Sequence, residues 1–168
     1  MALSDELKAR IRAELPKYPE KRAVLLTALH FIQEECGGWL EADVIPEVAE
    51  ILEIPPIDVK EVASFYAMFN ESPIGKRHVR VCTGLSCCLR GARQLQDAFE
   101  DELNIRPGEV TEEGSFSIGS VECLGSCGSA PVVQINTRTY LENLSPADAP
   151  AILENLRREI AEDEAETA

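Results

Sequence analysis

The sequence predicts an α+β protein, in which a helical bundle over residues 1–73 precedes an α/β domain over residues 74–168. Apolar residues recur at helical spacing through the first part, whereas short alternating patterns separated by helical ones fill the second part. The run Ser72-Pro73-Ile74-Gly75 marks the boundary, because proline and glycine both interrupt regular structure. The second part has the order strand, helix, strand, strand, helix, which indicates one small sheet with helices.

Four helices are expected before this boundary, over residues 4–15, 21–35, 43–53 and 59–69. Ser4 is a typical residue to cap the first helix. The pair Pro55-Pro56 ends the third helix. Asp58 is then expected to cap the fourth helix, and Tyr66 is among the residues expected to face inward.

Strands and helices alternate after the boundary. Strands are expected over residues 78–81, 116–122, 132–136 and 138–141, and helices over residues 91–103 and 145–160. Ser145 is expected to cap the last helix and Pro146 to open it. The tail over residues 162–168, EDEAETA, is acidic and offers nothing to a core, so we expect it to be solvated and frayed.

Composition narrows the classes of partner. The chain has 168 residues and a net charge of −14, whereas nucleic acids and anionic membranes attract clustered Lys and Arg, so neither is expected as a direct partner. No apolar stretch approaches the ~20 residues that span a bilayer, and the charged N-terminus MALSDELKAR lacks the apolar segment of a secretory signal. We therefore expect a cytoplasmic protein without membrane insertion, whose thiols stay reduced.

Five of the six cysteines form two tight groups in the second part of the chain. The first group, CTGLSCC, contains Cys82, Cys87 and Cys88, and the second, CLGSC, contains Cys123 and Cys127. Each group directly follows a predicted strand. Neighbouring strand ends would bring both loops to one edge of the sheet, where two thiolates from each loop predict a zinc ion or an iron–sulfur cluster. The pattern alone allows either Cys87 or Cys88 as the second ligand.

The spacing of these cysteines favours a cluster over a single ion. The gaps are four and three residues, and such loops suit a group larger than the ion held by the short knuckles of structural zinc sites. Gly84, Gly125 and Gly128 would let backbone N–H groups point at the cluster sulfurs. A zinc-stapled interaction module stays open as an alternative from a different class. A dithiol oxidoreductase would need a C-x2-C pair, which the sequence lacks.

Two longer runs carry a family resemblance. SFYAMFNESPIGKRHVRVCTGLSCCLRGA and VECLGSCGSAPVVQIN, with the GGW at residues 37–39, resemble the 24-kDa subunit of respiratory complex I. They are also similar to the matching subunits of NAD-linked hydrogenases and formate dehydrogenases. That family carries C-x4-C, about 35 residues and C-x3-C, and 35 residues lie between Cys87 and Cys123 here. The resemblance covers about residues 20–160 and selects Cys87 over Cys88.

The resemblance implies a function for the whole chain. The second part would be a thioredoxin-like [2Fe-2S] ferredoxin domain, with Pro131 at the position of the cis-proline of such folds. Its cluster would be held by Cys82, Cys87, Cys123 and Cys127. The chain would be an electron-transfer subunit of an NADH:quinone oxidoreductase, inactive alone and peripheral on the cytoplasmic side of the inner membrane.

The resemblance also implies a partner. The chain would form an obligate heterodimer with a subunit that binds NADH and FMN. The sequence of this chain contains no glycine-rich phosphate-binding loop, so we do not expect it to bind NADH or FMN by itself. An equivalent diaphorase subunit of a hydrogenase or formate dehydrogenase, and a free thioredoxin-like ferredoxin, are the alternatives within the family.

Overall fold

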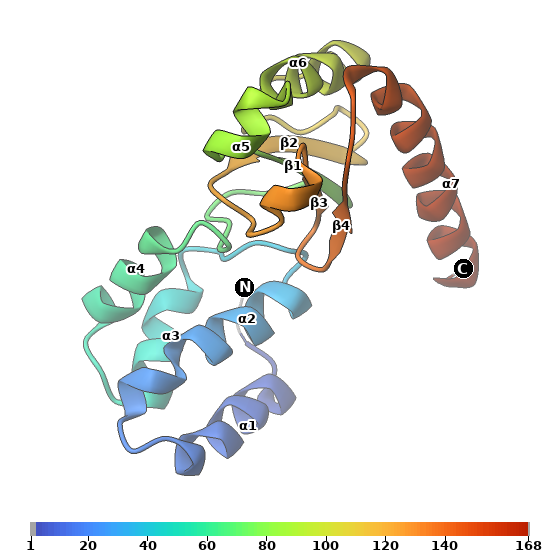
Figure 1. Cartoon of the computed structure of the whole chain (residues 1–168). Coiled ribbons are helices and arrows are strands. Elements are labelled where there is room, and N and C mark those ends of the chain that lie inside the picture. Colours follow the sequence, from blue (N-terminus) through green and yellow to red (C-terminus); the bar gives the residue numbers. More distant parts are fainter. Residues whose placement is uncertain (1–2, 168) are drawn as a thin grey trace. The chain divides into compact units, whose positions relative to one another are not determined.

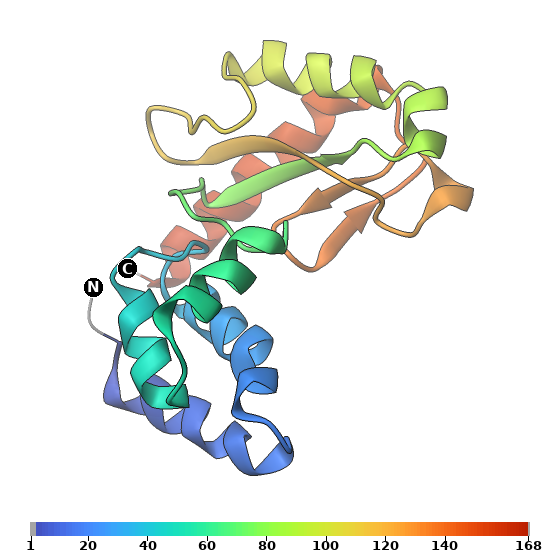
Figure 2. The same cartoon turned by 90° about the vertical axis from the view of Figure 1, so that its left-hand side faces the viewer.

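The computed structural model describes residues 3–167. The chain divides into two compact units, Met1–Pro73 and Ile74–Ala168 (Figures 1 and 2). Helices build the first unit, and the second adds a mixed sheet of four strands, so the predicted α+β class is confirmed. Each unit has its own cluster of buried apolar side chains.

The described part of the first unit contains four α-helices and two short 3-10 turns. These are α1 (Asp5–Glu14), η1 (Leu15–Lys17), η2 (Lys21–Val24), α2 (Leu25–Glu35), α3 (Val44–Leu52) and α4 (Pro56–Phe65). Ser4 caps α1 as expected, since its hydroxyl accepts the Leu7 N–H at 3.1 Å. Leu7, Ile11, Leu29 and Ile32 are fully buried, because each helix turns its apolar stripe toward a common core.

Two predictions for the fourth helix were wrong. The helix begins at Pro56, not after Asp58, because proline at a first helical position has no N–H to leave unpaired. Asp58 lies in the first turn, where its negative charge faces the positive end of the helix dipole. The helix also ends at Phe65, so Tyr66 turns outward and is 36% exposed, whereas Val59 and Ala63 are buried.

Most predicted elements of the second unit are present with small shifts in their ends. The strands are β1 (Arg77–Cys82), β2 (Phe116–Val121), β3 (Val133–Ile135) and β4 (Thr139–Leu141). The helices are α5 (Leu85–Leu89), α6 (Ala92–Leu103) and α7 (Ala149–Thr167), with 3-10 turns η3 (Cys127–Ser129) and η4 (Pro146–Asp148). The strands lie in the order β2-β1-β3-β4, and only β1 and β2 are parallel among the described pairs.

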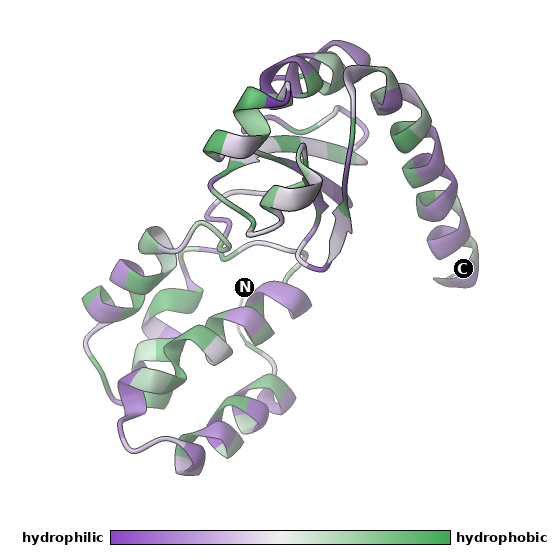
Figure 3. Ribbon diagram, viewed as in Figure 1, coloured by the Kyte–Doolittle hydropathy of each residue, from purple (hydrophilic) through white to green (hydrophobic). Residues whose placement is uncertain are grey.

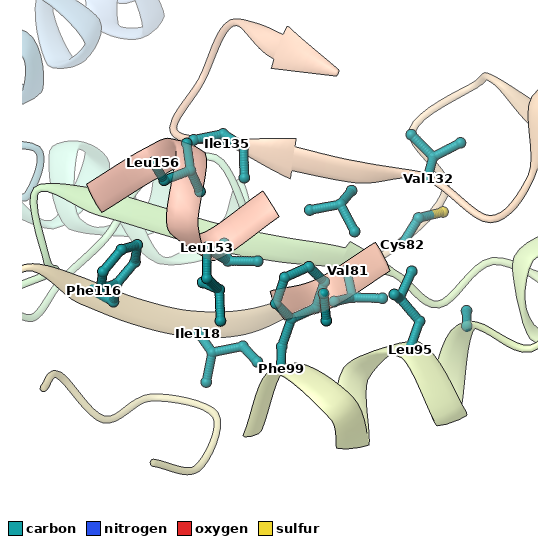
Figure 4. Packing of buried hydrophobic residues seen from close by; sticks show 14 of the residues in the cluster. Val81, Cys82, Leu95, Phe99, Phe116, Ile118, Val132, Ile135, Leu153 and Leu156 are labelled. Atoms are coloured by element: carbon teal, nitrogen blue, oxygen red, sulfur yellow. The ribbon is translucent and has the colours of Figure 1, made fainter. Parts of the chain in front are cut away.

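One face of this sheet packs against both long helices (Figure 4). Val81 and Ile118 project from neighbouring strands toward Phe99 of α6 and Leu153 of α7, and all four side chains are fully buried. Side chains of a strand alternate between the two faces of the sheet, so only every second residue of β1 and β2 points toward these helices. Burying each such side chain contributes roughly 1.5–3 kcal/mol, which makes this layer the main stabilising feature of the unit.

The intervening strand positions carry buried polar groups. His78, Arg80, Ser117 and Gln134 are each less than a tenth exposed. The Ser117 hydroxyl accepts the Gly75 N–H at 2.9 Å and lies 2.7 Å from His78 Nδ1. Its proton can therefore be donated to Nδ1 of a neutral imidazole. Burial, followed by the nearby positive charge of Arg80, lowers the pKa of His78 to about 4.

The acidic tail is helical, which contradicts the expectation that it frays. α7 continues to Thr167 because Glu and Ala are good helix formers. Exposed ion pairs also link it to the start of β1, where Arg77 contacts Asp163 at 2.6 Å and Lys76 contacts Glu164. The helix is mostly hydrophilic toward its C-terminal end (Figure 3), and residues 162–166 are exposed, so the expectation that the tail is solvated is confirmed for them. Residue 168 lies outside the described residues. At the other end, Ser145 caps the turn η4, which begins at Pro146 and leads into α7, and Asp148 completes a capping box that the sequence did not predict.

Within residues 3–167, none of the helices combines the length and apolar character needed to cross a membrane.

Candidate metal centre

The sheet topology brings the two cysteine loops together. β1 and β2 are adjacent and parallel, so both strands end at the same edge of the sheet. Cys82 is the last residue of β1 and pairs in register with Val121, the last residue of β2. Cys123 follows two residues later. The expectation that neighbouring strand ends carry the two loops is therefore confirmed.

A short helix that the sequence did not predict shapes the first loop. Gly84 precedes α5, and the helix turns Cys87 into the core, where the side chain is 2% exposed. Cys88, one position further, is partly exposed, and its thiol donates to the Thr83 carbonyl at 3.2 Å. A difference of one position on a helix rotates the side chain by about 100°. The local fold therefore separates the two cysteines that the pattern alone could not distinguish.

The second loop holds its cysteines at the surface. Cys123 and Cys127 are both exposed, and their sulfurs lie 3.6 Å apart. Gly125 lies between them with φ of +82°, a conformation that side chains disfavour, and its N–H donates to the Cys123 sulfur at 3.4 Å. The Gly125 N–H thus points at a cysteine sulfur, and its role toward a cluster stays a prediction. Pro131, which follows the loop, is joined to Ala130 by a cis peptide bond, as in thioredoxin-like folds.

One small pocket unites the four cysteines selected by the resemblance. It is lined by Cys82, Gly84, Ser86, Cys87, Cys123, Gly125, Ser126, Cys127 and Val132. Figure 4 shows Cys82 beside Val132 at the end of the apolar core. Cys36 and Cys88 are not among the lining residues, and neither is Gly128. The structure thus brings together two cysteines from each loop and leaves the other two outside.

Gly84 is where the two loops touch. A Cβ atom added there would lie 3.3 Å from the Cα and Cβ atoms of Cys123 and 3.5 Å from the Cys82 sulfur. The two contacts with Cys123 are tighter than ordinary van der Waals packing, so a side chain at this position requires Cys123 to shift by a few tenths of an ångström. An added Cβ at Gly128 would meet nothing within 4 Å, which gives this glycine no steric role at the pocket.

The donor set fits a metal–thiolate group. Two thiolates on one tetrahedral metal, with metal–sulfur bonds of about 2.3 Å, lie about 3.8 Å apart. The distance of 3.6 Å between the sulfurs of Cys123 and Cys127 is close to that value. Within residues 3–167, no group of three or more His, Cys, Asp or Glu side chains is arranged to hold a single ion.

Burial makes one of the pocket thiols, Cys87, harder to ionise. Burial, with a further contribution from the hydrogen bond to Cys82, raises the pKa of Cys87 to about 11. Cys87 is therefore a protonated thiol at neutral pH in the metal-free chain, and metal binding has to displace its proton. The Cys82 thiol donates a hydrogen bond to the Glu122 carbonyl at 3.2 Å.

A carboxylate that sequence reasoning missed contacts the second loop. Glu142 follows β4, and its Oε1 accepts hydrogen bonds from the hydroxyls of Ser126 and Ser129, the latter at 2.7 Å. Ser126 also lines the cysteine pocket. Nothing in the sequence pattern connects Glu142 with the loop, because the contact depends on how the β3–β4 hairpin folds back.

The chain is similar to a known protein family and to named proteins. The family described as thioredoxin-like [2Fe-2S] ferredoxin matches residues 11–157. A subunit of the NADH-quinone oxidoreductase of Rickettsia bellii is 44% identical over 147 residues, which are 86% of this chain and 87% of that protein. A subunit of the NADH-quinone oxidoreductase of Thermus thermophilus is 41% identical over 159 residues, covering 94% of this chain and 87% of that protein.

A solved structure is similar over most of the chain. The crystal structure of an NAD+-reducing [NiFe]-hydrogenase in the air-oxidized state superposes with a TM-score of 0.68 at 26% sequence identity. The match covers 83% of this chain and 24% of the hydrogenase chain, so the similarity spans about a quarter of that larger protein.

Proposed function

The chain belongs to the thioredoxin-like [2Fe-2S] ferredoxin family, and from this membership we propose that it is an electron-transfer subunit of an NADH:quinone oxidoreductase. One observation carries the proposal: of the six cysteines, the four with the family spacing line one pocket, two from each loop. The relatives named as subunits of NADH-quinone oxidoreductases are 41–44% identical over most of their length, which supports a subunit of an oxidoreductase complex.

Four residues would hold the [2Fe-2S] cluster: Cys82, Cys87, Cys123 and Cys127. When bound, the cluster supplies reversible one-electron chemistry to the complex. The buried pair would fix it to the sheet edge, and the exposed pair would present it toward the surface. The Gly125 N–H already points at a sulfur, and such donors stabilise negative charge on thiolates.

The flavin and NADH sites belong, in this proposal, to a partner subunit. Electron transfer requires the partner to approach the cysteine pocket closely, because transfer rates fall steeply with distance. Leu85 lies in the first loop and Leu89 directly follows it, both on α5; they are 77% and 79% exposed, although both are large apolar side chains. Exposed apolar groups beside the pocket support docking of another subunit at this place. We propose that the assembled chain is peripheral on the cytoplasmic side of the membrane.

Two alternatives remain within the family. Similarity to an NAD+-reducing hydrogenase favours a diaphorase subunit as the second candidate, since the superposition covers most of this chain. A free ferredoxin would work without a stable partner. Expressing the chain with its genomic neighbours and identifying the flavoprotein that co-purifies separates the three, because a respiratory subunit, a hydrogenase subunit and a free carrier would yield different partners or none.

The test of the cluster itself is spectroscopic. We expect the full chain, purified without oxygen, to be red-brown, to contain two iron and two sulfide ions per chain, and to bleach with dithionite. C123S should prevent formation of this chromophore, whereas C36S, which alters a cysteine outside the pocket, should leave it intact. A colourless protein that contains zinc would contradict the proposal and support the zinc-stapled interaction module.

A further inference from the structure

Hydrogen bonds join the second cysteine loop to the segment after β4. Glu142 Oε1 accepts from the hydroxyls of Ser126 and Ser129, and these two hydroxyls lie 2.8 Å from each other. The backbone adds two further bonds, since Asn143 N–H donates to the Ser129 carbonyl at 2.7 Å and Leu144 N–H donates to the Pro131 carbonyl at 3.3 Å. Glu142 is the charged group of this network.

The loop depends on such contacts because it has little regular structure. Between the end of β2 and the start of β3, the only described helical segment is the turn η3. Both cysteines are exposed, and Gly125 at φ of +82° is conformationally permissive. Ser126 directly precedes Cys127 and lines the pocket. A hydrogen bond to Ser126 therefore restrains the backbone that carries the Cys127 sulfur.

The carboxylate is well suited to this role. A single ionised oxygen can accept both hydroxyl protons, and hydrogen bonds with a charged acceptor are stronger than those between neutral groups. The bond from Ser126, followed by that from Ser129, lowers the pKa of Glu142, so the group is ionised at neutral pH. It also places a negative charge beside the hydroxyl of Ser126, the residue that directly precedes Cys127.

We propose that Glu142 is a positioning residue for the cluster, which acts through Ser126 and Ser129 to hold Cys123 and Cys127 in place for binding. This inference rests on the proposed function, because it concerns the same four thiolates. It assigns two separable effects to one side chain. Its hydrogen bonds restrain the backbone of the second cysteine loop, and its negative charge disfavours the additional electron of the reduced cluster.

The test compares variants of the full chain loaded with iron and sulfide. E142A removes both the acceptor and the charge, whereas E142Q keeps an amide oxygen that can accept the same hydroxyl protons. S126A/S129A removes the donors. E113A and E113Q are the matched controls, because Glu113 is an exposed carboxylate in the loop before β2. The measurements are the rate at which a ferrous-iron chelator removes the visible absorbance, the EPR spectrum of the reduced protein, and the midpoint potential.

We expect E142A and S126A/S129A each to accelerate chelator-driven loss of the chromophore roughly fivefold to tenfold, the scale of one lost hydrogen bond. The combined variant E142A/S126A/S129A should lose the chromophore no faster than E142A or S126A/S129A, because the effects of substitutions that remove the same contact do not add. E142Q should stay within about twofold of the unsubstituted chain. Its midpoint potential should nevertheless rise, since the charge is gone. E113A and E113Q should change neither rate nor potential.

Several outcomes would overturn the inference. The first is that E142A and E113A lose the chromophore at the same rate and have the same EPR spectrum. The second is that the effects of substituting Glu142 and the two serines on this rate add. The third is that E142Q loses the chromophore as fast as E142A. An equal drop in melting temperature for the metal-free and loaded E142A chains would show a general stability effect and also overturn it. If the unsubstituted chain holds no iron and sulfide, the proposed function fails together with the inference. If that chain loads normally and E142A is indistinguishable from it, only the inference fails.

Discussion

At the scale of single residues, the cysteine pocket combines buried and exposed thiols. Cys82 and Cys87 are each 2% exposed, while Cys123 and Cys127 are exposed. The buried pair is fixed by the core that also contains Val81 and Leu95, whereas the exposed pair relies on hydrogen bonds. Small reagents should therefore reach the pocket from the side of the second loop.

Substitution of the two adjacent cysteines tests the ligand assignment. C87S should lose most of the bound iron, because Cys87 lines the pocket, while C88S should retain it, because its thiol contacts the Thr83 carbonyl instead. The iron and sulfide content of each variant, purified without oxygen, shows whether it binds the cluster. Retention of iron in C87S together with its loss in C88S would reverse the assignment.

His78 links stability to pH. The folded pKa of about 4 lies below the value of about 6.5 for an unfolded histidine, so the unfolded chain takes up a proton first as the pH falls. Stability should thus be full above about pH 6.5 and decrease between 6.5 and 4, by about 3 kcal/mol in total. Denaturant unfolding of the metal-free chain at several pH values measures this slope.

H78Q should flatten that pH dependence. Glutamine does not titrate, and its amide oxygen can accept from the Ser117 hydroxyl, so the unfolded state no longer gains a proton that the folded state lacks. H30Q, at the other histidine of the sequence, is the control and should keep the slope of the unsubstituted chain. An unchanged slope in H78Q would mean that other groups produce the pH dependence.

Residue roles were predictable to the extent that they depended on spacing. The two cysteine groups could be recognised from their spacing, although only the family resemblance selected Cys87 over Cys88. Ser4 follows a local capping rule, so its role could be read from neighbouring positions. Glu142 could not, because its partners lie 13 and 16 residues away and are reached through a hairpin. Tyr66 was misplaced because the helix ends at Phe65, four residues before the end that the apolar spacing suggests.

At the scale of elements, α5 has the largest functional consequence. Four of its five residues lie within the first cysteine loop, and no helical period can be recognised over so short a segment. The longer helices and the strands were predictable because each repeats its apolar pattern over enough positions. The tail was misjudged because its helix depends on good helix formers and on contacts with Lys76 and Arg77, rather than on an apolar face.

The exposed face of α5 yields a prediction about assembly. L85S/L89S should weaken binding of the flavin-bearing partner by more than about 100-fold, because each buried leucine contributes roughly 1.5–3 kcal/mol to an apolar contact. Iron content should stay unchanged, since neither side chain lines the pocket. Y140S, at another exposed apolar residue, serves as a control that should bind normally. Equal co-purification of the unsubstituted chain and both variants would exclude α5 from the interface.

At the scale of the whole molecule, we propose that the two compact units are separate domains. Each has its own buried cluster, and the four pocket cysteines all belong to the unit Ile74–Ala168. The cores therefore need not form together. A net charge of −14 should also favour solubility of the whole chain over self-association.

A fragment of residues 74–168 tests this division. We expect it to unfold cooperatively and to bind iron and sulfide at the stoichiometry of the full chain, because its sheet, helices and cysteines are complete. Partner binding should be weaker if the helical unit supplies part of the interface. The measurements are circular dichroism melting and iron analysis. A fragment without a cooperative transition would show that the first unit is needed for folding.

The parallel register of β1 and β2 has a consequence for the divergence of such sequences. Because Cys82 pairs with Val121, an insertion or deletion of one residue inside either strand would reverse the faces and misdirect a ligand. Changes of length in the connections 104–115 and 136–138 leave that alignment untouched. Natural variants should accordingly differ in length within those connections, while the strands that precede the two cysteine loops keep a constant number of residues.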